Sequence, residues 1–360
     1  MPTTYAEFND KTEAVEVAKA FKSRIQGKTA LVTGGNIKGL GFSHAYGLAS
    51  GGPAHLILAG RTSSKMAECI AAINAGFPDV DVRPLEVDLS SQKSVRAAAA
   101  IVLGWSDIPT IDYIVNVAGV MGIPKRTLSV DGIEIQMGTN HVGHWLLACL
   151  LMPKLIAAAD GKPKGSVRIV NVSSGSPFIA TMRWSDMNFD KVNKTLPAVE
   201  QPNYQFMARW GYTGLEDVPY AGIDGYNRSK VANVLCGIGF TNALYEKYGI
   251  LGLAVHPGVI KTELGRDFPP EVTASVEHMA ASGDFTYKTL GAGASTALVA
   301  ALDPKIIVEP HGGPDNKENY GAFMMDCQVT DKTQPLAVAT SEANKLWTWS
   351  EEQVKEKFSW

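Results

Sequence analysis

The stretch TALVTGGNIKGLG at residues 29–41 decides the fold. Residues 29–34 form an aliphatic, β-branched run that is typical of a buried strand, and residues 39–50 have a helical pattern. Glycines between a strand and a helix let backbone amides approach an anion, which the helix N-terminus also favours. The loop is neither a P-loop nor a GxGxxG turn, because Leu40-Gly41 stands where a P-loop has Lys-Ser/Thr. The stretch therefore predicts the first turn of a nucleotide-binding βαβ unit.

Short apolar runs alternate with longer helical patterns along the chain, which indicates further βαβ units. Strands are predicted at residues 55–60, 82–89, 111–119, 166–174, 250–258 and 320–326, and helices at residues 63–75, 91–103, 133–159 and 226–248. Because these strands are apolar on both faces, helices should cover both faces of the sheet. The predicted fold class is α/β, a Rossmann-type, doubly wound sheet of seven parallel strands. We expect an N-terminal helical extension over residues 1–27 and one domain over residues 28–360.

Two segments interrupt the alternation, and both follow the carboxyl ends of predicted strands. Residues 175–225 contain eight of the thirty aromatic residues, and residues 259–290 follow the sixth strand. Open α/β sheets bind ligands at this edge, so we expect a pocket wall from the first segment and a substrate loop from the second. The aromatic side chains of the first segment have an alternative role, which is to pack a small core of their own.

Composition excludes several classes of protein. A formal net charge of −3 over 360 residues gives no basic field for nucleic acid or anionic membrane. The four cysteines form no CxxC pair, so neither a disulfide framework nor a thiolate metal site is expected. The N-terminal segment is too charged for a signal peptide, and no apolar run approaches the roughly 18 residues of a membrane span. We expect a cytoplasmic protein without a metal or a membrane span.

Basic residues near the glycine loop bear on the choice of nucleotide. Arg61 follows the second strand, where an acidic residue would bind the ribose hydroxyls of NAD, and Lys38 lies inside the loop. An Arg suits a 2′-phosphate through charge-assisted hydrogen bonds, so the pair favours NADP(H). Each side chain has the alternative role of a solvated surface cation. Asp88, at the end of the third strand, is placed either to accept from adenine or to cap the turn.

Seven motifs in chain order resemble those of the short-chain dehydrogenase/reductase family: TGGNIKGLG, VDLS (87–90), NVAG (116–119), TNHVGHWLL (139–147), RIVNVSS (168–174), YNRSK (226–230) and HPGVIKTEL (256–264). The C-terminal segments GAFMMDCQV and EANKLWTWSEEQV resemble its retinol-dehydrogenase-like and WW-domain-oxidoreductase-like branch. The resemblance implies catalysis by Tyr226, Lys230, Ser174 and Asn140. It also implies that the cofactor contacts Tyr226, Lys230 and a further set of residues: Gly34, Asn36, Lys38, Gly39, Leu40, Arg61, Asp88, Leu89, Asn116, Ala118, Gly119, Pro257, Gly258, Val259 and Thr262.

The chemistry of these residue types agrees with the resemblance. Tyr226 and Lys230 are four residues apart on a predicted helix, so their side chains share a face. We expect the ammonium to lower the pKa of the tyrosine, which would make it an acid or base near neutral pH. Ser174 would bind the substrate oxygen, and Ser173 is the alternative because a strand alternates its faces. Asn140 matches the family's position for a water-mediated proton relay.

His141 and His144 flank that asparagine at helical spacing, and no acidic third ligand accompanies them. We expect core or pocket histidines rather than metal ligands. Three departures from the family pattern stand out: the glycine loop has one extra residue, Val117 replaces a common Asn, and the separation between Ser174 and Tyr226 is several times longer than usual.

The sequence predicts an NADP(H)-dependent oxidoreductase that reduces a ketone or aldehyde to an alcohol. The aromatic segment suggests a bulky, apolar or aromatic substrate, such as a polyketide-type or terpenoid carbonyl of secondary metabolism. The alternatives are an NADP(H)-binding regulatory or scaffold protein without turnover, and an epimerase or dehydratase acting on a sugar nucleotide. The resemblance also implies a homodimer or homotetramer, although the added terminal segments are placed to block such pairing.

Overall fold

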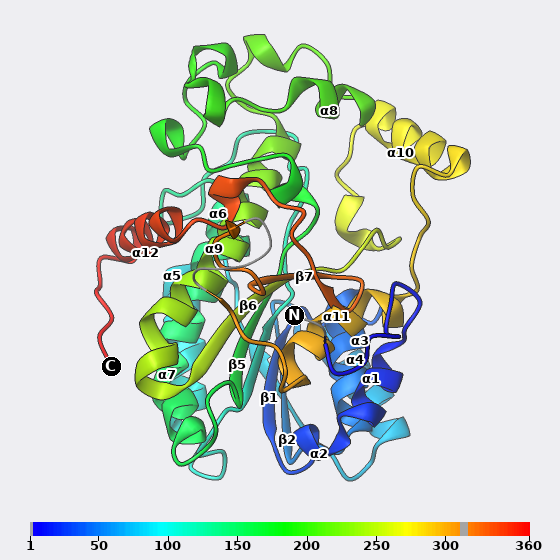
Figure 1. Cartoon of the computed structure of the whole chain (residues 1–360), viewed down its shortest axis with the longest axis vertical. Helices are drawn as coiled ribbons and strands as arrows, with labels where there is room; N and C mark the ends of the chain where they lie inside the picture. Colours follow the sequence, from blue (N-terminus) through cyan, green and yellow to red (C-terminus); the bar gives the residue numbers. More distant parts are fainter. Residues whose placement is uncertain (1–2, 310–315) are drawn as a thin grey trace.

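The computed structural model describes residues 3–309 and 316–360 and contains the predicted doubly wound sheet (Figure 1). Its strand order is β3-β2-β1-β4-β5-β6-β7-β8, and all pairs are parallel except β7 with β8. The order reverses between β1 and β4, so a crevice opens beyond the carboxyl ends of these two strands. The strands are β1 (Thr29–Thr33), β2 (His55–Gly60), β3 (Asp81–Glu86), β4 (Tyr113–Asn116), β5 (Val167–Val172), β6 (Ile250–His256), β7 (Phe323–Met325) and β8 (Gln328–Val329).

The sheet has one strand more than the seven that were predicted. β8 is antiparallel to β7 and follows it through a two-residue turn. Both turn residues, Asp326 and Cys327, have positive φ values of 51° and 64°. A tight hairpin needs this left-handed backbone, but it usually has Gly or Asn there. Without those residues the turn gives no recognisable signal in the sequence.

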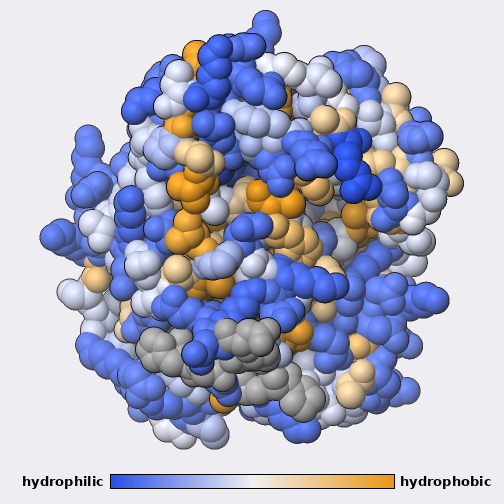
Figure 2. Space-filling model, turned by 45° about the horizontal axis from the view of Figure 1, so that its top comes forward, coloured by the Kyte–Doolittle hydropathy of each residue, from blue (hydrophilic) through white to orange (hydrophobic). Residues whose placement is uncertain are grey.

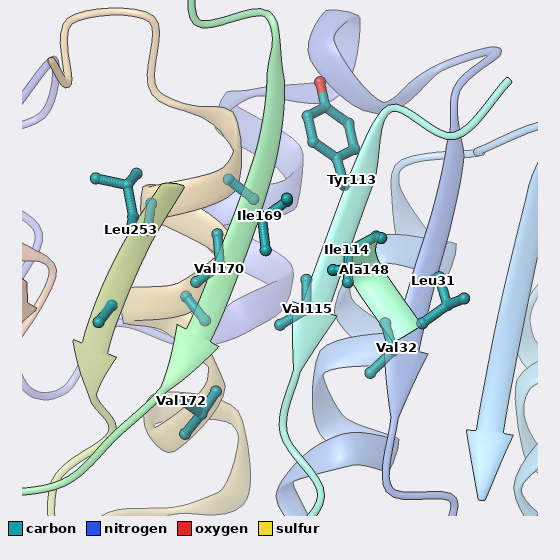
Figure 3. Close-up of a cluster of buried hydrophobic side chains, with 14 of the residues drawn as sticks. Leu31, Val32, Tyr113, Ile114, Val115, Ala148, Ile169, Val170, Val172 and Leu253 are labelled. Atoms are coloured by element: carbon teal, nitrogen blue, oxygen red, sulfur yellow. The ribbon is translucent and has the colours of Figure 1, made fainter. Parts of the chain in front are cut away.

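Helices cover both faces of the sheet (Figure 1). One layer contains α1 (Ala14–Ala20), α3 (Leu40–Ser50), α4 (Ser63–Gly76) and α11 (Leu290–Leu302). The other contains α5 (Gln92–Gly104), α7 (Gly143–Ala159), α9 (Gly222–Tyr248) and α12 (Thr340–Val354). Within the N-terminal extension, α1 and α2 (Lys22–Ile25) are helical. Figure 3 shows why both layers are needed, because the central strands carry apolar side chains on each face.

The two interrupting segments stand beyond the carboxyl ends of the strands, where Figure 1 shows α8 (Tyr204–Arg209) and α10 (Pro270–Ser282). The rest of residues 175–225 is mainly short 3-10 turns and loops. Buried contacts anchor this segment to the start of α9, since Arg183 lies 3.6 Å from Asp224 and Arg228 donates to the carbonyls of Thr181 and Glu200. The anchored segment ends beside the predicted catalytic tyrosine.

One helical run, Ile135–Ala159, is long and apolar enough to cross a membrane. Most of it is buried inside the protein, where α7 packs on the sheet beside α5 and α9 and contacts α12 through Trp145 and Trp347. A buried core helix can be as long and as apolar as a helix that spans a membrane. The run comprises α6 (Ile135–Met137), a π-helical turn (Gly138–Val142) and α7.

Candidate active site

A cleft of about 430 Å³ lies at the switch point of the sheet. The glycine loop forms its floor. Gly34 has a φ of +100°, and a side chain at Gly41 would meet the carbonyl oxygen of Gly34 at 2.2 Å. These two positions therefore require glycine, and they bring backbone amides to the N-terminus of α3. Most of the predicted cofactor contacts line the cleft, namely Gly34, Asn36, Lys38, Gly39, Leu40, Arg61, Asp88, Leu89, Ala118, Gly119, Tyr226, Lys230, Pro257 and Thr262.

The extra residue of the glycine loop is accommodated by a turn. Gly39 donates its backbone N–H to the carbonyl of Asn36 at 2.8 Å, and Ile37 between them packs against the hydrophobic core. Lys38 is exposed and lines the cleft. The longer loop thus still lines the cleft with its glycine backbone, and Lys38 adds a cation to the cleft.

Three cations line one end of this cleft. Arg61 and Lys38, expected from the sequence, are both exposed there, and among the described residues neither forms an ion pair. Lys65, in the first turn of α4, is the third and was not singled out in the sequence. The sequence feature that could have identified Lys65 is its position four residues after Arg61, close to the start of a predicted helix. Such a cluster suits a phosphate on the adenosine ribose.

Glu263 reaches this cluster from the substrate loop. Its carboxylate accepts from the side-chain amide of Asn36 at 2.9 Å and lies 3.6 Å from the Lys65 ammonium. These contacts and nearby Lys38 hold the pKa of Glu263 below its usual value, with the amide of Asn36 making the largest contribution. The substrate loop is therefore tied to the glycine loop across the cleft.

Some predicted cofactor residues lie outside the cleft. The side chain of Asn116 donates to Asn171 at 2.9 Å in the interior between β4 and β5, so the structure does not bring it to the cleft. Gly258 and Val259 instead line a neighbouring apolar cavity. Asp88 lines the cleft and also caps the local turn, because its carboxylate accepts from the backbone and hydroxyl of Ser90.

Tyr226 and Lys230 lie on one buried face of α9, as predicted from their spacing. The Lys230 Nζ atom is 5.6 Å from the centre of the Tyr226 ring and donates to the carbonyl of Val172 at 2.8 Å. Both side chains line the cleft, and Tyr226 also lines the apolar cavity. Tyr226 is thus one of the residues at which the two spaces meet.

The expectation that Lys230 lowers the pKa of Tyr226 is wrong for this structure. Burial raises the pKa of Tyr226 well above its ordinary value, and a hydrogen bond with Ser174 offsets this in part. Burial lowers the pKa of Lys230 to about 7. Desolvation is the largest cause of both shifts, so Tyr226 is a neutral phenol near pH 7 and Lys230 is the group whose pKa lies near 7.

The structure separates the two serines at the end of β5. Ser173 lines the cleft and the cavity, but its buried hydroxyl donates to the carbonyl of Lys230 at 2.6 Å. Ser174 lines the apolar cavity, hydrogen-bonds Tyr226, and shares a 2.6 Å contact with the hydroxyl of Ser176. Ser176 in turn donates to the side-chain oxygen of Asn227 at 2.7 Å. Ser174 is accordingly the serine beside the phenol, and the Ser176–Asn227 chain behind it was not found in the sequence.

Asn140 lies in the π-helical turn and is fully buried. Its side chain donates to the carbonyl of Val120 and to the hydroxyl of Ser229, both at 2.9 Å, and its oxygen accepts from the backbone of Val120. His144 contacts the Asn140 carbonyl at 3.0 Å and the Thr33 hydroxyl at 2.9 Å. These contacts form one connected polar network around Asn140.

The two histidines have structural partners. His141 contacts the hydroxyl of Ser350 at 2.8 Å, which joins α12 to the core, while His144 joins the networks of β1 and the π-helical turn. Burial lowers the pKa of His141 to about 3 and that of His144 to about 4, so both are neutral. Within residues 3–309 and 316–360, no cluster of side chains could hold a metal ion.

A second cavity of about 750 Å³ adjoins the cleft. Many of its apolar side chains come from the aromatic segment, α9 and α10, namely Phe178, Ile179, Phe206, Met207, Trp210, Ile223, Val276 and Ala280, and others come from the substrate loop. Figure 2 shows apolar surface gathered in a hollow near the centre of this face and hydrophilic residues around it. The aromatic segment serves both of the roles considered for it, since Phe189 and Tyr220 pack together at 5.4 Å while Phe206 and Trp210 line the cavity.

Comparisons with known proteins agree with this architecture. The family model described as short chain dehydrogenase matches residues 28–185. Oxidoreductase fscI of Fusarium equiseti is 34% identical over 251 residues, which cover 70% of this chain and 94% of that protein. Human retinol dehydrogenase 14 is 30% identical over 348 residues, which cover 92% of this chain and 87% of that protein.

The fold is shared with solved structures. L-sorbose reductase from Gluconobacter frateurii, solved with NADPH and L-sorbose, has a TM-score of 0.54 and 19% identity over 78% of this chain and 91% of its own. At this identity the likeness establishes the fold, while the relatives above establish descent. The chain belongs to the short-chain dehydrogenase/reductase family, in its retinol-dehydrogenase-like branch.

Proposed function

We propose that this oxidoreductase is an NADP(H)-dependent carbonyl reductase that converts a bulky, apolar or aromatic ketone or aldehyde to an alcohol. The observation that carries the proposal is the position of Tyr226, whose buried phenol lines both the cleft and the apolar cavity. A group at this junction can contact a bound cofactor and a bound carbonyl together. The working compartment we propose is the cytoplasm, where NADPH favours reduction.

The residues of the cleft fit a dinucleotide phosphate. The glycine loop and the N-terminus of α3 would hold the pyrophosphate, and Val87, Asp88 and Leu89 would line the adenine slot. Arg61, Lys38 and Lys65 would hold the 2′-phosphate. When bound, NADPH supplies a hydride to the carbonyl carbon.

The chain's own residues complete the reduction by handling the substrate oxygen. Tyr226, protonated at neutral pH because burial raises its pKa, donates its proton to that oxygen as charge develops on it. Ser174, hydrogen-bonded to the phenol, orients the oxygen. Lys230, with its pKa near 7, would return a proton to the Tyr226 phenolate, and Asn140, buried in its own polar network, would support this resupply as the family resemblance implies. One hydride and one proton added to the C=O bond give the alcohol.

The test is NADPH consumption by the purified full chain against a panel of aromatic and aliphatic ketones, with NADH as the parallel cofactor. We expect turnover with NADPH that is lost in Tyr226→Phe, since that variant keeps the ring and removes the proton. Ser174→Ala should lower kcat strongly, whereas the matched control Ser173→Ala should keep most of it. Wild-type turnover that Tyr226→Phe retains would overturn the proposed chemistry. Binding of NADPH without turnover of any carbonyl would favour a regulatory or scaffold protein.

A further inference from the structure

His256 is a polar side chain that lines the second cavity. It ends β6, and Val255 before it pairs with Val172 of β5. His256 therefore lies one strand beyond the serines, about 4.8 Å across the sheet, on the side away from the cofactor cleft. Its ring packs edge-on to Phe178 at 5.8 Å. The residue is not among those through which the family resemblance assigned a role.

The hydrogen-bonding state of His256 follows from its contacts. The backbone N–H of Gly258 donates to Nδ1 at 3.3 Å, so Nδ1 carries no proton. Burial, with a smaller contribution from Lys288, lowers the pKa of His256 to about 4 against an opposing effect of Asp326, and the ring is neutral at pH 7. A neutral ring with an unprotonated Nδ1 carries its hydrogen on Nε2. Nε2 is thus a donor, and among the described residues it has no hydrogen-bond partner.

Gly175 keeps this donor accessible. A Cβ atom at Gly175 would lie 3.6 Å from Nε2 and 3.5 Å from the Phe178 ring. The backbone of Gly175 has a φ of −74°, which any residue can adopt, so its conformation does not require glycine. Its missing side chain instead leaves open space beside Nε2, on the wall of the cavity that both residues line.

Other polar side chains that line the cavity either have hydrogen-bond partners in the protein or are exposed at its edge. Asn227 accepts from Ser176, and Ser174 hydrogen-bonds the phenol. The charged side chains belong to the substrate loop and to α10, and these include the exposed Lys261 and Glu263. The Nε2–H of His256 borders the cavity without a protein partner, so a bound molecule that offers an oxygen there can accept from it.

We propose that His256 is a specificity-determining residue whose Nε2–H donates a hydrogen bond to a second oxygen of the substrate. The inference rests on the proposed carbonyl reduction and narrows its substrate class. The preferred substrate is a bulky aromatic or apolar carbonyl compound with a further carbonyl, phenol or hydroxyl oxygen. The reacting carbonyl lies at Tyr226 and Ser174, and the second oxygen lies toward β6.

The experiment compares alpha-tetralone with its ring-hydroxylated derivatives as substrates, with NADPH as cofactor. In the wild-type chain, at least one hydroxylated derivative should have a kcat/KM about 3- to 10-fold above that of the parent ketone, as expected for one neutral hydrogen bond. His256→Phe keeps an aromatic ring without the donor and should remove this preference while leaving the parent ketone's kcat/KM within about twofold.

Three further variants separate recognition from folding. His256→Gln restores an N–H near Nε2 and should recover part of the preference. Gly175→Ala leaves His256 in place but puts a methyl group beside Nε2, so it should weaken the preference. Val276→Ala on the α10 wall is the matched control and should change all tetralones alike. Circular dichroism and thermal midpoints of each variant would identify misfolding.

The outcomes distinguish the two proposals. A hydroxylated tetralone preferred equally by wild type and by folded His256→Phe, or no preference in the wild type, would overturn the role of His256 while leaving carbonyl reduction intact. Failure of the wild-type chain to reduce any ketone with NADPH or NADH would overturn the proposed function, and the substrate subsite with it.

Discussion

Replacing Lys230 with methionine should stabilise the protein without added nucleotide while it abolishes turnover. The lysine is 3% exposed, and burial lowers its pKa from 10.5 to about 7. At about 1.36 kcal/mol for each pKa unit, this shift corresponds to about 5 kcal/mol of folding free energy lost when the unfolded lysine is charged. Methionine has a similar length and no charge, so it does not incur that cost.

The substitution also removes one favourable contact, the hydrogen bond from Lys230 to the Val172 carbonyl. That carbonyl keeps the side chain of Asn233 as a donor at 3.1 Å, so the loss is about 1 kcal/mol. The net gain expected for Lys230→Met is therefore about 4 kcal/mol at pH 6. Activity should be lost because the group that titrates near neutrality is gone.

The pH dependence gives the sign of the effect. Between about pH 7 and 10.5 the unfolded chain holds a proton on Lys230 that the folded chain does not, so wild-type stability rises with pH through this window. At pH 9 the remaining cost in the wild type is about 2 kcal/mol, and the advantage of the variant should shrink to about 1 kcal/mol.

Urea unfolding followed by tryptophan fluorescence at pH 6 and pH 9 measures this difference. Lys230→Arg keeps a charge and is the matched control, for which no gain is expected. A Lys230→Met variant that is no more stable than wild type at pH 6, or whose advantage is the same at both pH values, would contradict the role assigned to desolvation of the lysine.

Three other perturbations test separate parts of the structure. Arg61→Ala should raise the KM for NADPH about tenfold and leave that for NADH unchanged, because one charge-assisted contact to the 2′-phosphate is lost; equal changes in steady-state assays would contradict this. Glu263→Gln should tighten NADPH binding by less than about tenfold, more at low salt, because a carboxylate leaves the cation cluster; titration calorimetry showing weaker binding would reverse its role. Trp347→Ala should lose about 2 kcal/mol of stability in urea, since the Trp347 ring packs at 5.4 Å on both Trp145 and Phe240. Because α12 covers α7 and α9, the full chain should sediment as a monomer. A dimer formed through α7 and α9 would contradict this packing.

The fold could be predicted in large part because its signals are local. Each predicted strand is present, since aliphatic runs bounded by turn residues need no distant partner to be recognised. The β7–β8 hairpin was missed because Asp326 and Cys327 adopt left-handed backbone without the usual glycine. The π-helical turn at residues 138–142 also has no local signal, because it lies inside a helical pattern that continues on both sides.

The candidate site was predicted where residues are close in sequence. Tyr226 and Lys230 share a helix face, so four residues of spacing were enough to place them together. The contact of Glu263 with Asn36 joins residues 227 positions apart, and only the folded chain reveals it. The pKa of Tyr226 was predicted in the wrong direction because spacing reports a neighbouring charge and not the burial that outweighs it.

The central claim is hydride transfer from a nicotinamide to a carbonyl carbon beside Tyr226. The most direct measurement uses NADPH that carries deuterium at both positions of C4, with a ketone that the wild-type chain reduces, and mass spectrometry of the alcohol. We expect one deuterium on the carbinol carbon in the wild-type product and no alcohol from Tyr226→Phe. An alcohol without deuterium, or labelled alcohol formed equally well by Tyr226→Phe, would contradict it.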